Sequence, residues 1–214
     1  MSKRTVITER HIVDASRAGE KVIVAPGNAL VTPLARDAAK KAGISITLGT
    51  AKGESSPPGA PVPNPTICIG SDHGGFELKK ELIEWLTSKG KSVLDLGTDS
   101  TKSCDYPDYA YAVALTVVEG KAGVGIMIDG VGVGSSMVCN KVPGIRAACA
   151  YNEFAAWNAR AHNNANVLTL GSRSMGPEVV KRIVDVFLST EFEGGRHQKR
   201  VQKIEDVEAR FFKK

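Results

Sequence analysis

"GIMIDGVGVGSSM", residues 125–137, is the stretch of this chain that decides the fold. An apolar run ends at an acid, Asp129, and glycines follow at every second position, Gly130, Gly132 and Gly134. A strand, a glycine turn and a helix in this order indicate an α/β protein with parallel strands. The turn either only joins strand to helix or presents unpaired backbone N–H groups to an anion, and the stretch alone leaves both interpretations open.

Strand and helix signals alternate on both sides of this stretch. Before it, "TICIG" and "KSVLDLG" indicate strands, and "FELKKELIEWLTSKG" and "DYPDYAYAVALTVVEG" indicate helices. After it, "GIRAACA" and "NVLTLG" indicate strands, "NEFAAWNARAH" and "GPEVVKRIVDVFLS" indicate helices, and a last helix covers about 199–212. This alternation predicts a doubly wound, Rossmann-like α/β fold with a five-stranded parallel sheet covered by helices on both faces.

A linker separates this pattern from the start of the chain. The segment "GTAKGESSPPGAPVPNP" is rich in Gly, Ser and Pro, which disfavour regular helix and sheet. We therefore expect an N-terminal extension over 1–52, a linker over 53–65 and a main domain over 66–214.

The extension is expected to be small and mainly helical. A helix is predicted over 8–18 and a short strand over 22–25. In "TPLARDAAKKAG", Thr32 is a good N-cap, proline occupies the first helical position and Gly43 follows the last turn. Such short elements bury little area, so we expect the extension to dock on another surface.

Composition excludes several classes of protein. The 214 residues are 42% hydrophobic and 24% charged, as in an ordinary globular domain. No apolar run approaches the roughly 20 residues of a membrane helix, and the N-terminus lacks the apolar core of a signal peptide. The four cysteines form no CxxC pair, so we expect reduced thiols in a cytoplasmic protein and no metal site.

The positive charge is uneven along the chain. The net charge is +5, and residues 1–64 carry nine Lys and Arg residues against five Asp and Glu residues. No basic run is interleaved with aromatic residues, so we do not expect a nucleic-acid partner. We also expect no membrane partner.

Polar residues gather where the predicted strands end. Parallel sheets bind ligands beyond the carboxyl ends of their strands. Asp72 and His73 follow the first strand of the main domain, and Arg173 follows the last. Arg196 and Arg200 are four residues apart, which places them on one side of a helical start. Because arginine matches phosphate geometry, these positions favour a phosphorylated small molecule as ligand.

At "GSDHGG", "DYPDYA", "NKVPGIRAA", "HNNANVLTLGSR" and "FEGGRHQKRVQKIE" the chain resembles the ribose-5-phosphate isomerase type B and galactose-6-phosphate isomerase family of aldose–ketose isomerases. The resemblance covers about 66–212. It implies a doubly wound α/β fold, a homodimer or tetramer with active sites shared between subunits, and neither a metal nor an organic cofactor.

The resemblance also implies roles for individual residues. His162 would open the sugar ring by moving the proton between the ring oxygen and the anomeric hydroxyl. Asn163 would hold substrate oxygens, and Asp72 would contact the hydroxyls near the reacting carbons. His73 and the arginines would hold the phosphate, and the loop N–H groups the cis-enediolate. The implied substrate-binding set is His73, Tyr106, Gly130, Gly132, Val133, Gly134, Asn140, Arg173, Arg196 and Arg200.

One departure from the family falls on the chemistry. Many members carry a cysteine base where this chain has Asp129, with Thr or Ser where it has Val131. Other members use a Glu where it has Ser135. A free Asp has a pKa near 3.9, and burial in apolar surroundings would raise it toward the range of a useful base. We expect Asp129 to be the enolising base; the alternative is that it caps the N–H groups of the next helix.

The predicted reaction is conversion of ribose 5-phosphate to ribulose 5-phosphate through a cis-enediolate. One alternative is another substrate, galactose 6-phosphate or a four-carbon sugar phosphate. Another is a non-catalytic subunit, since "DGVGVGSSMV" looks like one subunit type of the galactose-6-phosphate isomerases, whose partner subunit carries the cysteine.

The N-terminal extension resembles a different family. Its "IT", its "GE" turn and its "TP-AR-A---G" pattern are similar to the start of the ethanolamine-utilisation cupin proteins of bacterial microcompartments. This implies a tether to a microcompartment shell or to a neighbouring enzyme, and hence a location inside a microcompartment. An arm that stabilises a dimer is the alternative.

Overall fold

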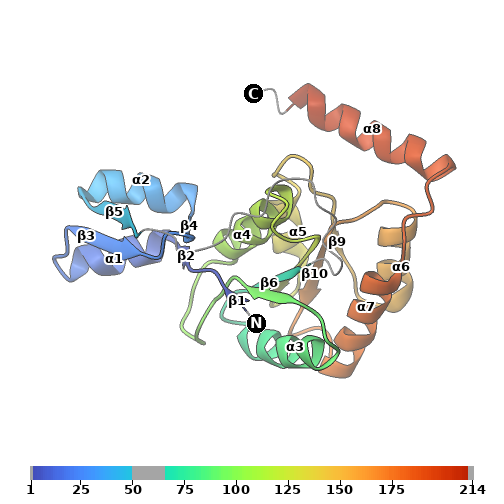
Figure 1. The fold of residues 1–214 in the computed structure, drawn as a ribbon, viewed down its shortest axis with the longest axis horizontal. Helices are drawn as coiled ribbons and strands as arrows, with labels where there is room; N and C mark the ends of the chain where they lie inside the picture. Colours follow the sequence, from blue (N-terminus) through green and yellow to red (C-terminus); the bar gives the residue numbers. More distant parts are fainter. Residues whose placement is uncertain (1, 50–65, 212–214) are drawn as a thin grey trace.

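The computed structural model describes residues 2–49 and 66–211, so the expected linker over 53–65 lies outside the described residues. Its main sheet has six parallel strands, and helices cover both faces (Figure 1). The doubly wound fold is confirmed, and a sixth strand from the N-terminal residues joins the five expected ones. The spatial order is β1 (Ser2–Lys3), β7 (Val93–Asp95), β6 (Ile67–Ser71), β8 (Val124–Asp129), β10 (Val167–Gly171) and β9 (Ala147–Cys149).

Successive side chains of the strands pack alternately in two separate hydrophobic cores. Ile67 and Ile69 of β6 pack in one core, and Cys68 between them packs in the other. Strands buried on both faces in this way read as continuous apolar runs. Three helices contribute to the first core: α3 (Phe76–Ser88), α6 (Glu153–Ala161) and α7 (Pro177–Ser189). The second core receives α4 (Tyr106–Val118) and α5 (Val133–Cys139).

The last helix, α8 (Arg196–Phe211), begins three residues before the expected start at about 199. It leaves the α/β body and runs toward the C-terminus at the edge of the molecule (Figure 1). No helix among residues 2–49 and 66–211 is both long and apolar enough to cross a membrane.

The order of the strands creates a switch point between β6 and β8. The chain leaves β6 for β7 on one side and then returns to β8 on the other side. Ligand sites of open α/β sheets lie beyond the carboxyl ends of the strands at such a point. Here Asp72 follows β6, Asp129 ends β8, and the backbone N–H of Asp72 donates to Ile128 O at 3.1 Å.

Residues 2–49, the N-terminal unit, contain two consecutive strand–helix–strand segments. The first holds β2 (Val6–Ile7), α1 (Glu9–Arg17) and β3 (Val22–Ala25); the second holds β4 (Leu30–Val31), α2 (Pro33–Ala42) and β5 (Ser45–Leu48). β2 pairs with β4, and β3 with β5, both in parallel. Both expected helices are present: Thr32 accepts the Ala35 N–H, and Gly43 ends α2 with a φ of 64°.

The N-terminal unit is joined to the main domain by a strand pairing and by shared core contacts. Its strand β1 extends the main sheet, and Val6 and Leu30 enter the core that contains Tyr109. Arg4 is buried and pairs with Glu119 at 3.1 Å. The expectation that this segment docks on another surface is thereby met within the same chain.

Candidate active site

The candidate site residues fall into two groups. The first, the strand-end group, lies where β6, β8 and β10 end; it comprises Asp72, His73, Tyr106, Asp129, Arg173 and the loop 130–134. The second, the helix-end group, lies where α6 ends and α8 begins; it comprises His162, Asn163, Glu193, Arg196 and His197.

Asp129 is buried and holds the glycine loop. Its Oδ1 accepts the backbone N–H groups of Val131, at 2.7 Å, and of Gly132. Its Oδ2 accepts the N–H of Ser135 at 3.2 Å and the Ser135 hydroxyl at 2.5 Å. The capping alternative is therefore realised in this structure, and the role of Asp129 as a base stays a prediction.

The same bonds divide the loop N–H groups into two sets. Val131, Gly132 and Ser135 donate to Asp129. The N–H groups of Val133 and Gly134 open α5 and have no partner among the described residues. These two N–H groups are available to an anion, as expected of a helix N-terminus after a glycine turn.

Asp72 accepts its bonds from the turn that follows it. Its Oδ1 accepts the Gly75 N–H at 3.0 Å, and the Gly74 N–H also interacts with the carboxylate. Burial raises the pKa of Asp72, and the nearby carboxylate of Asp129 raises it further. A carboxylate with a raised pKa is better suited to proton transfer near neutral pH.

Glycines bring two predicted side chains onto the loop. A Cβ on Gly134 would lie 2.7 Å from the Tyr106 ring and hydroxyl, so any larger residue at 134 would displace the ring from this position. A Cβ on Gly130 would lie 3.6 Å from Cδ of Arg173, an ordinary contact distance. The structure therefore brings Tyr106 and Arg173 to the two ends of the loop.

His73 is held by a neighbouring turn. Its Nδ1 lies 3.2 Å from the backbone N and 3.1 Å from the backbone O of Cys104. This contact fixes the ring from the side of the segment that connects β7 to α4.

In the helix-end group two imidazole rings are stacked. The rings of His162 and His197 lie 3.9 Å apart, at 9° to each other. Asn158 Nδ2 lies 2.9 Å from His162 Nδ1, and Glu193 Oε2 lies 3.6 Å from His162 Nε2 and 3.5 Å from His197 Nε2. If Asn158 donates, the neutral His162 carries its proton on Nε2, facing Glu193.

Arg196, one of the predicted phosphate contacts, is hydrogen-bonded to this stack of histidines. Its Nε donates to His197 Nε2 at 3.2 Å. Burial lowers the pKa of His197, and the neighbouring His162 and Arg196 lower it further. Asn163 bonds to Asn158 O at 3.2 Å, and Arg200 lies one turn after Arg196 on α8.

Two of these residues were not predicted. Glu193 and His197 lie in the polar segment "EFEGGRHQKR", four residues apart, and touch His162. Their spacing across the start of a helix was the available signal.

Together with His162, Glu193 and His197 offer ligand atoms within 4.8 Å of one another. A metal ion lies near the plane of an imidazole it binds, at about 2.0–2.1 Å for zinc. One ion cannot lie in two parallel ring planes 3.9 Å apart, so these rings are not arranged to share it.

Asn140 is engaged elsewhere. Its side chain accepts the Ala147 N–H and donates to Ala147 O, both at 2.9 Å, which ties the end of α5 to β9. Its predicted contact with substrate stays a prediction.

The two groups do not meet in a single chain. Within residues 2–49 and 66–211, no hydrogen bond, ion pair or ring contact joins the strand-end group to the helix-end group. The helix-end group instead borders an open groove of about 580 Å³, whose lining includes Asn163, Phe154 and Ile204.

Comparison with known proteins shows which family the chain belongs to. The profile of the Ribose/Galactose Isomerase family matches residues 67–204. Ribose-5-phosphate isomerase B of Escherichia coli is 47% identical over 144 residues, which are 67% of this chain and 97% of that protein. D-erythrulose-4-phosphate isomerase of Pectobacterium atrosepticum is 42% identical over 140 residues, 65% of this chain and 92% of the relative.

A solved structure supports the same family assignment. Ribose-5-phosphate isomerase B of Clostridium thermocellum superposes with a TM-score of 0.68 at 47% identity, covering 68% of this chain and 99% of that one. The N-terminal residues lie outside the family match, which begins at residue 67. The chain belongs to the ribose/galactose isomerase family and is an aldose–ketose isomerase.

Proposed function

We propose that this protein converts ribose 5-phosphate to ribulose 5-phosphate through a cis-enediolate. The observation that carries the proposal is the meeting of Asp72 and Asp129 at the β6/β8 switch point, over a loop with unpaired N–H groups and beside Arg173. An isomerase of this kind needs a base at the reacting carbons, donors for the enediolate oxygen and a cation for the phosphate.

The proposed steps assign each proton. His162 moves the hydroxyl proton that opens the ring. Asp129 takes the proton from C2 and returns it to C1, while the hydroxyl proton moves from O2 to O1. The oxygen that develops charge is held by the N–H groups of Val133 and Gly134. In this scheme the Ser135 hydroxyl rotates away from Oδ2 of Asp129, which keeps its longer bond from the Ser135 N–H and can take the proton.

A second copy of the chain completes the proposed site. The two groups hold complementary parts of the chemistry but do not touch within one chain. Phe154 and Ile204 are exposed and line the groove at the helix-end group, and further exposed apolar side chains lie on α5 and α8: Met137, Val207 and Phe211. Large exposed apolar surfaces mark protein interfaces, and a two-fold dimer would bring each strand-end group to the partner's helix-end group.

One experiment tests the reaction. The purified protein is incubated with aldose phosphates of four, five and six carbons in deuterated water, and deuterium at the carbon next to the carbonyl is followed by NMR. Exchange with ribose 5-phosphate above the others is expected. Preference for the four-carbon sugar would agree with the Pectobacterium relative instead. Binding without exchange of any sugar would indicate a non-catalytic subunit.

We further propose that the N-terminal unit anchors the enzyme to a microcompartment shell or to an enzyme inside it. The unit leaves Val22 and Val24 of β3 exposed, 49% and 76% respectively. A two-stranded parallel sheet with an open face is unusual without a partner. The full chain fused to a fluorescent reporter should form foci in cells that make such shells, and Val24→Lys should disperse them; a diffuse signal from the unchanged chain contradicts the proposal.

A further inference from the structure

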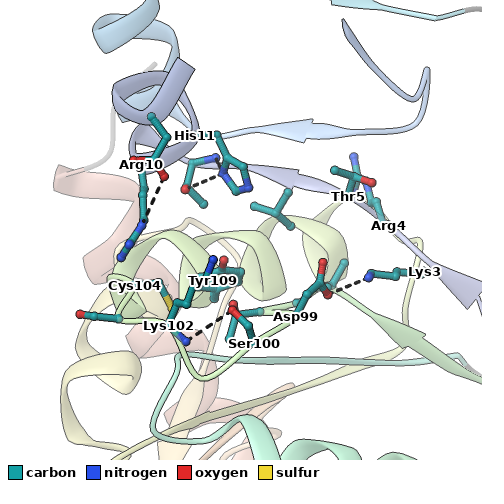
Figure 2. Close-up of a pocket in the computed structure, with 17 residues that line it drawn as sticks. Lys3, Arg4, Thr5, Arg10, His11, Asp99, Ser100, Lys102, Cys104 and Tyr109 are labelled. Atoms are coloured by element: carbon teal, nitrogen blue, oxygen red, sulfur yellow. Dashed lines mark hydrogen bonds and ion pairs between the residues drawn. The ribbon is translucent and has the colours of Figure 1, made fainter. Parts of the chain in front are cut away.

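A cavity of about 210 Å³ lies between the N-terminal unit and the isomerase body (Figure 2). One wall comes from the start of the chain and from α1; the other comes from the segment 96–104 and Tyr109. No residue assigned to substrate lines it. Because the family match begins at residue 67, the family's own part of the chain forms only one of its walls.

The lining carries more cationic than anionic groups. Lys3, Arg4, Arg10 and Lys102 line the cavity together with two acids, Asp14 and Asp99. Lys3 pairs with Asp99 at 2.7 Å, and Arg4 pairs with Glu119 outside the cavity.

The two remaining cations are available to a ligand. Arg10 reaches Asp14 at 3.6 Å, with both side chains about half exposed, which is a weak pair. Lys102 has no ion pair among the described residues. Figure 2 shows Arg10 on the side of the N-terminal unit and Lys102 on the opposite wall, so an anion between them would meet both.

His11 adds a neutral donor to the same wall. Its Nδ1 accepts the backbone N–H of Thr8 at 3.1 Å, so the neutral ring carries its proton on Nε2. Surrounding protein atoms lower the pKa of His11 although part of the residue is exposed, which keeps the ring neutral. Nε2 has no partner in the described part of the chain, and the Ser100 and Ser103 hydroxyls lie on the facing wall.

The wall that carries Lys102 is continuous with the active site. The N–H of Ser71 donates to Gly97 O at 2.8 Å, and the N–H of Thr98 donates to Ser71 O at 2.9 Å. At the other end of the segment, Cys104 holds the His73 ring. A shift of the segment 96–104 therefore moves residues next to Asp72 and His73.

We propose that this cavity is a second anion site, which binds a small phosphorylated metabolite between Lys102, Arg10 and His11 and transmits its occupancy to His73 through the segment 96–104. Binding requires only the cavity and stands apart from the proposed reaction. Its effect on turnover rests on that reaction.

The test is a titration of the uniformly ¹⁵N-labelled full-length protein with inorganic phosphate, followed by NMR. The amide signals of Ser100 and Lys102 should shift in the unchanged protein and in Arg173→Ala, which weakens the anion site at the glycine loop. Lys102→Ala should weaken the Ser100 titration about tenfold, as expected for loss of one charge-assisted contact. Lys40→Ala, which removes an exposed lysine of the N-terminal unit outside the cavity, should leave the Ser100 titration unchanged.

The proposed coupling between the cavity and His73 is measured separately, from the His73 ring signals. In Arg173→Ala the His73 ring signals should still shift when phosphate is added. In the double variant with Lys102→Ala, the part of this shift that comes from the cavity should be lost. Shifts confined to the glycine loop, or a Ser100 titration equal in Lys102→Ala and the unchanged protein, would overturn the proposal. Because no turnover is measured, a failed isomerase assay leaves these outcomes readable.

Discussion

The strand-end group and the helix-end group differ in the chemical groups they contain and in how firmly the structure holds them. The strand-end group is built around buried carboxylates and backbone N–H groups at the end of a buried sheet; Asp129 alone accepts bonds from three different residues. The helix-end group consists of rings and long side chains where one helix ends and another begins, and only His197 among them is buried. The strand-end group is therefore the more rigid of the two, while the helix-end group faces an open groove, where the proposed partner chain would complete the site.

The largest effect is expected at the rigid group. Asp129→Asn should lower kcat by about 10²–10⁴-fold if the carboxylate is the base. It also places an amide where Oδ2 accepts two bonds from Ser135, so Tm should fall. Steady-state kinetics and calorimetry on one sample separate the two roles.

The control for this prediction is Ser135→Ala. It removes the hydroxyl bond but keeps the carboxylate, so Tm should fall while most turnover survives. Full turnover in Asp129→Asn would show that the residue only caps the loop.

Steric change within the loop should have the next largest effect. Gly134→Ala places a methyl group 2.7 Å from the ring and hydroxyl of Tyr106, so the ring must move away from the loop. We expect a raised KM from displacement of Tyr106 and a lower Tm. Gly130→Ala, whose methyl group would meet Arg173 at 3.6 Å, is the matched control and should change both far less.

Substitutions in the helix-end group should change the kinetic constants less. Glu193→Gln keeps the size of the side chain but removes the charge beside both histidines, so it should lower kcat by about tenfold or less and shift the pH profile. His197→Phe preserves the stack but removes the acceptor of Arg196, so it should mainly raise KM. An unchanged pH profile in Glu193→Gln would separate this carboxylate from the action of His162.

The smallest expected effect is a gain in stability. Burial raises the pKa of Asp72 in the folded protein above its unfolded value, so ionisation of Asp72 disfavours the fold. Stability is lost as pH rises from the unfolded pKa through the folded pKa. Asp72→Asn should therefore raise Tm slightly at pH 7 and not at pH 3, while activity falls; a lower Tm at pH 7 contradicts this.

The contrast between the groups also explains what the sequence could predict. Asp72, Asp129 and Arg173 directly follow apolar runs, and parallel strands end at one edge, so their proximity followed from the pattern. Glu193 and His197 follow no strand, and their relation to His162 depends on where α6 ends and α8 begins. Helix ends are the least certain part of such a prediction.

Two further features had no periodic signal. Strand β1 has only two residues, Ser2 and Lys3, which pair with Leu94 and Asp95. The bonds from Val131 and Gly132 back to Asp129 depend on loop dihedral angles, such as the φ of 88° at Gly132, that a glycine permits but does not specify.

Complementation tests the central claim, that one chain supplies the strand-end group and its partner the helix-end group. Asp72→Asn and His162→Asn are each purified, mixed in equal amounts, unfolded and refolded together. Random pairing makes half of the dimers mixed, each with one intact site, so about a quarter of full activity should return. The control mixture of Asp72→Asn with Asp129→Asn should stay inactive. No recovery in the first mixture, or equal recovery in both, would contradict a site shared between two chains.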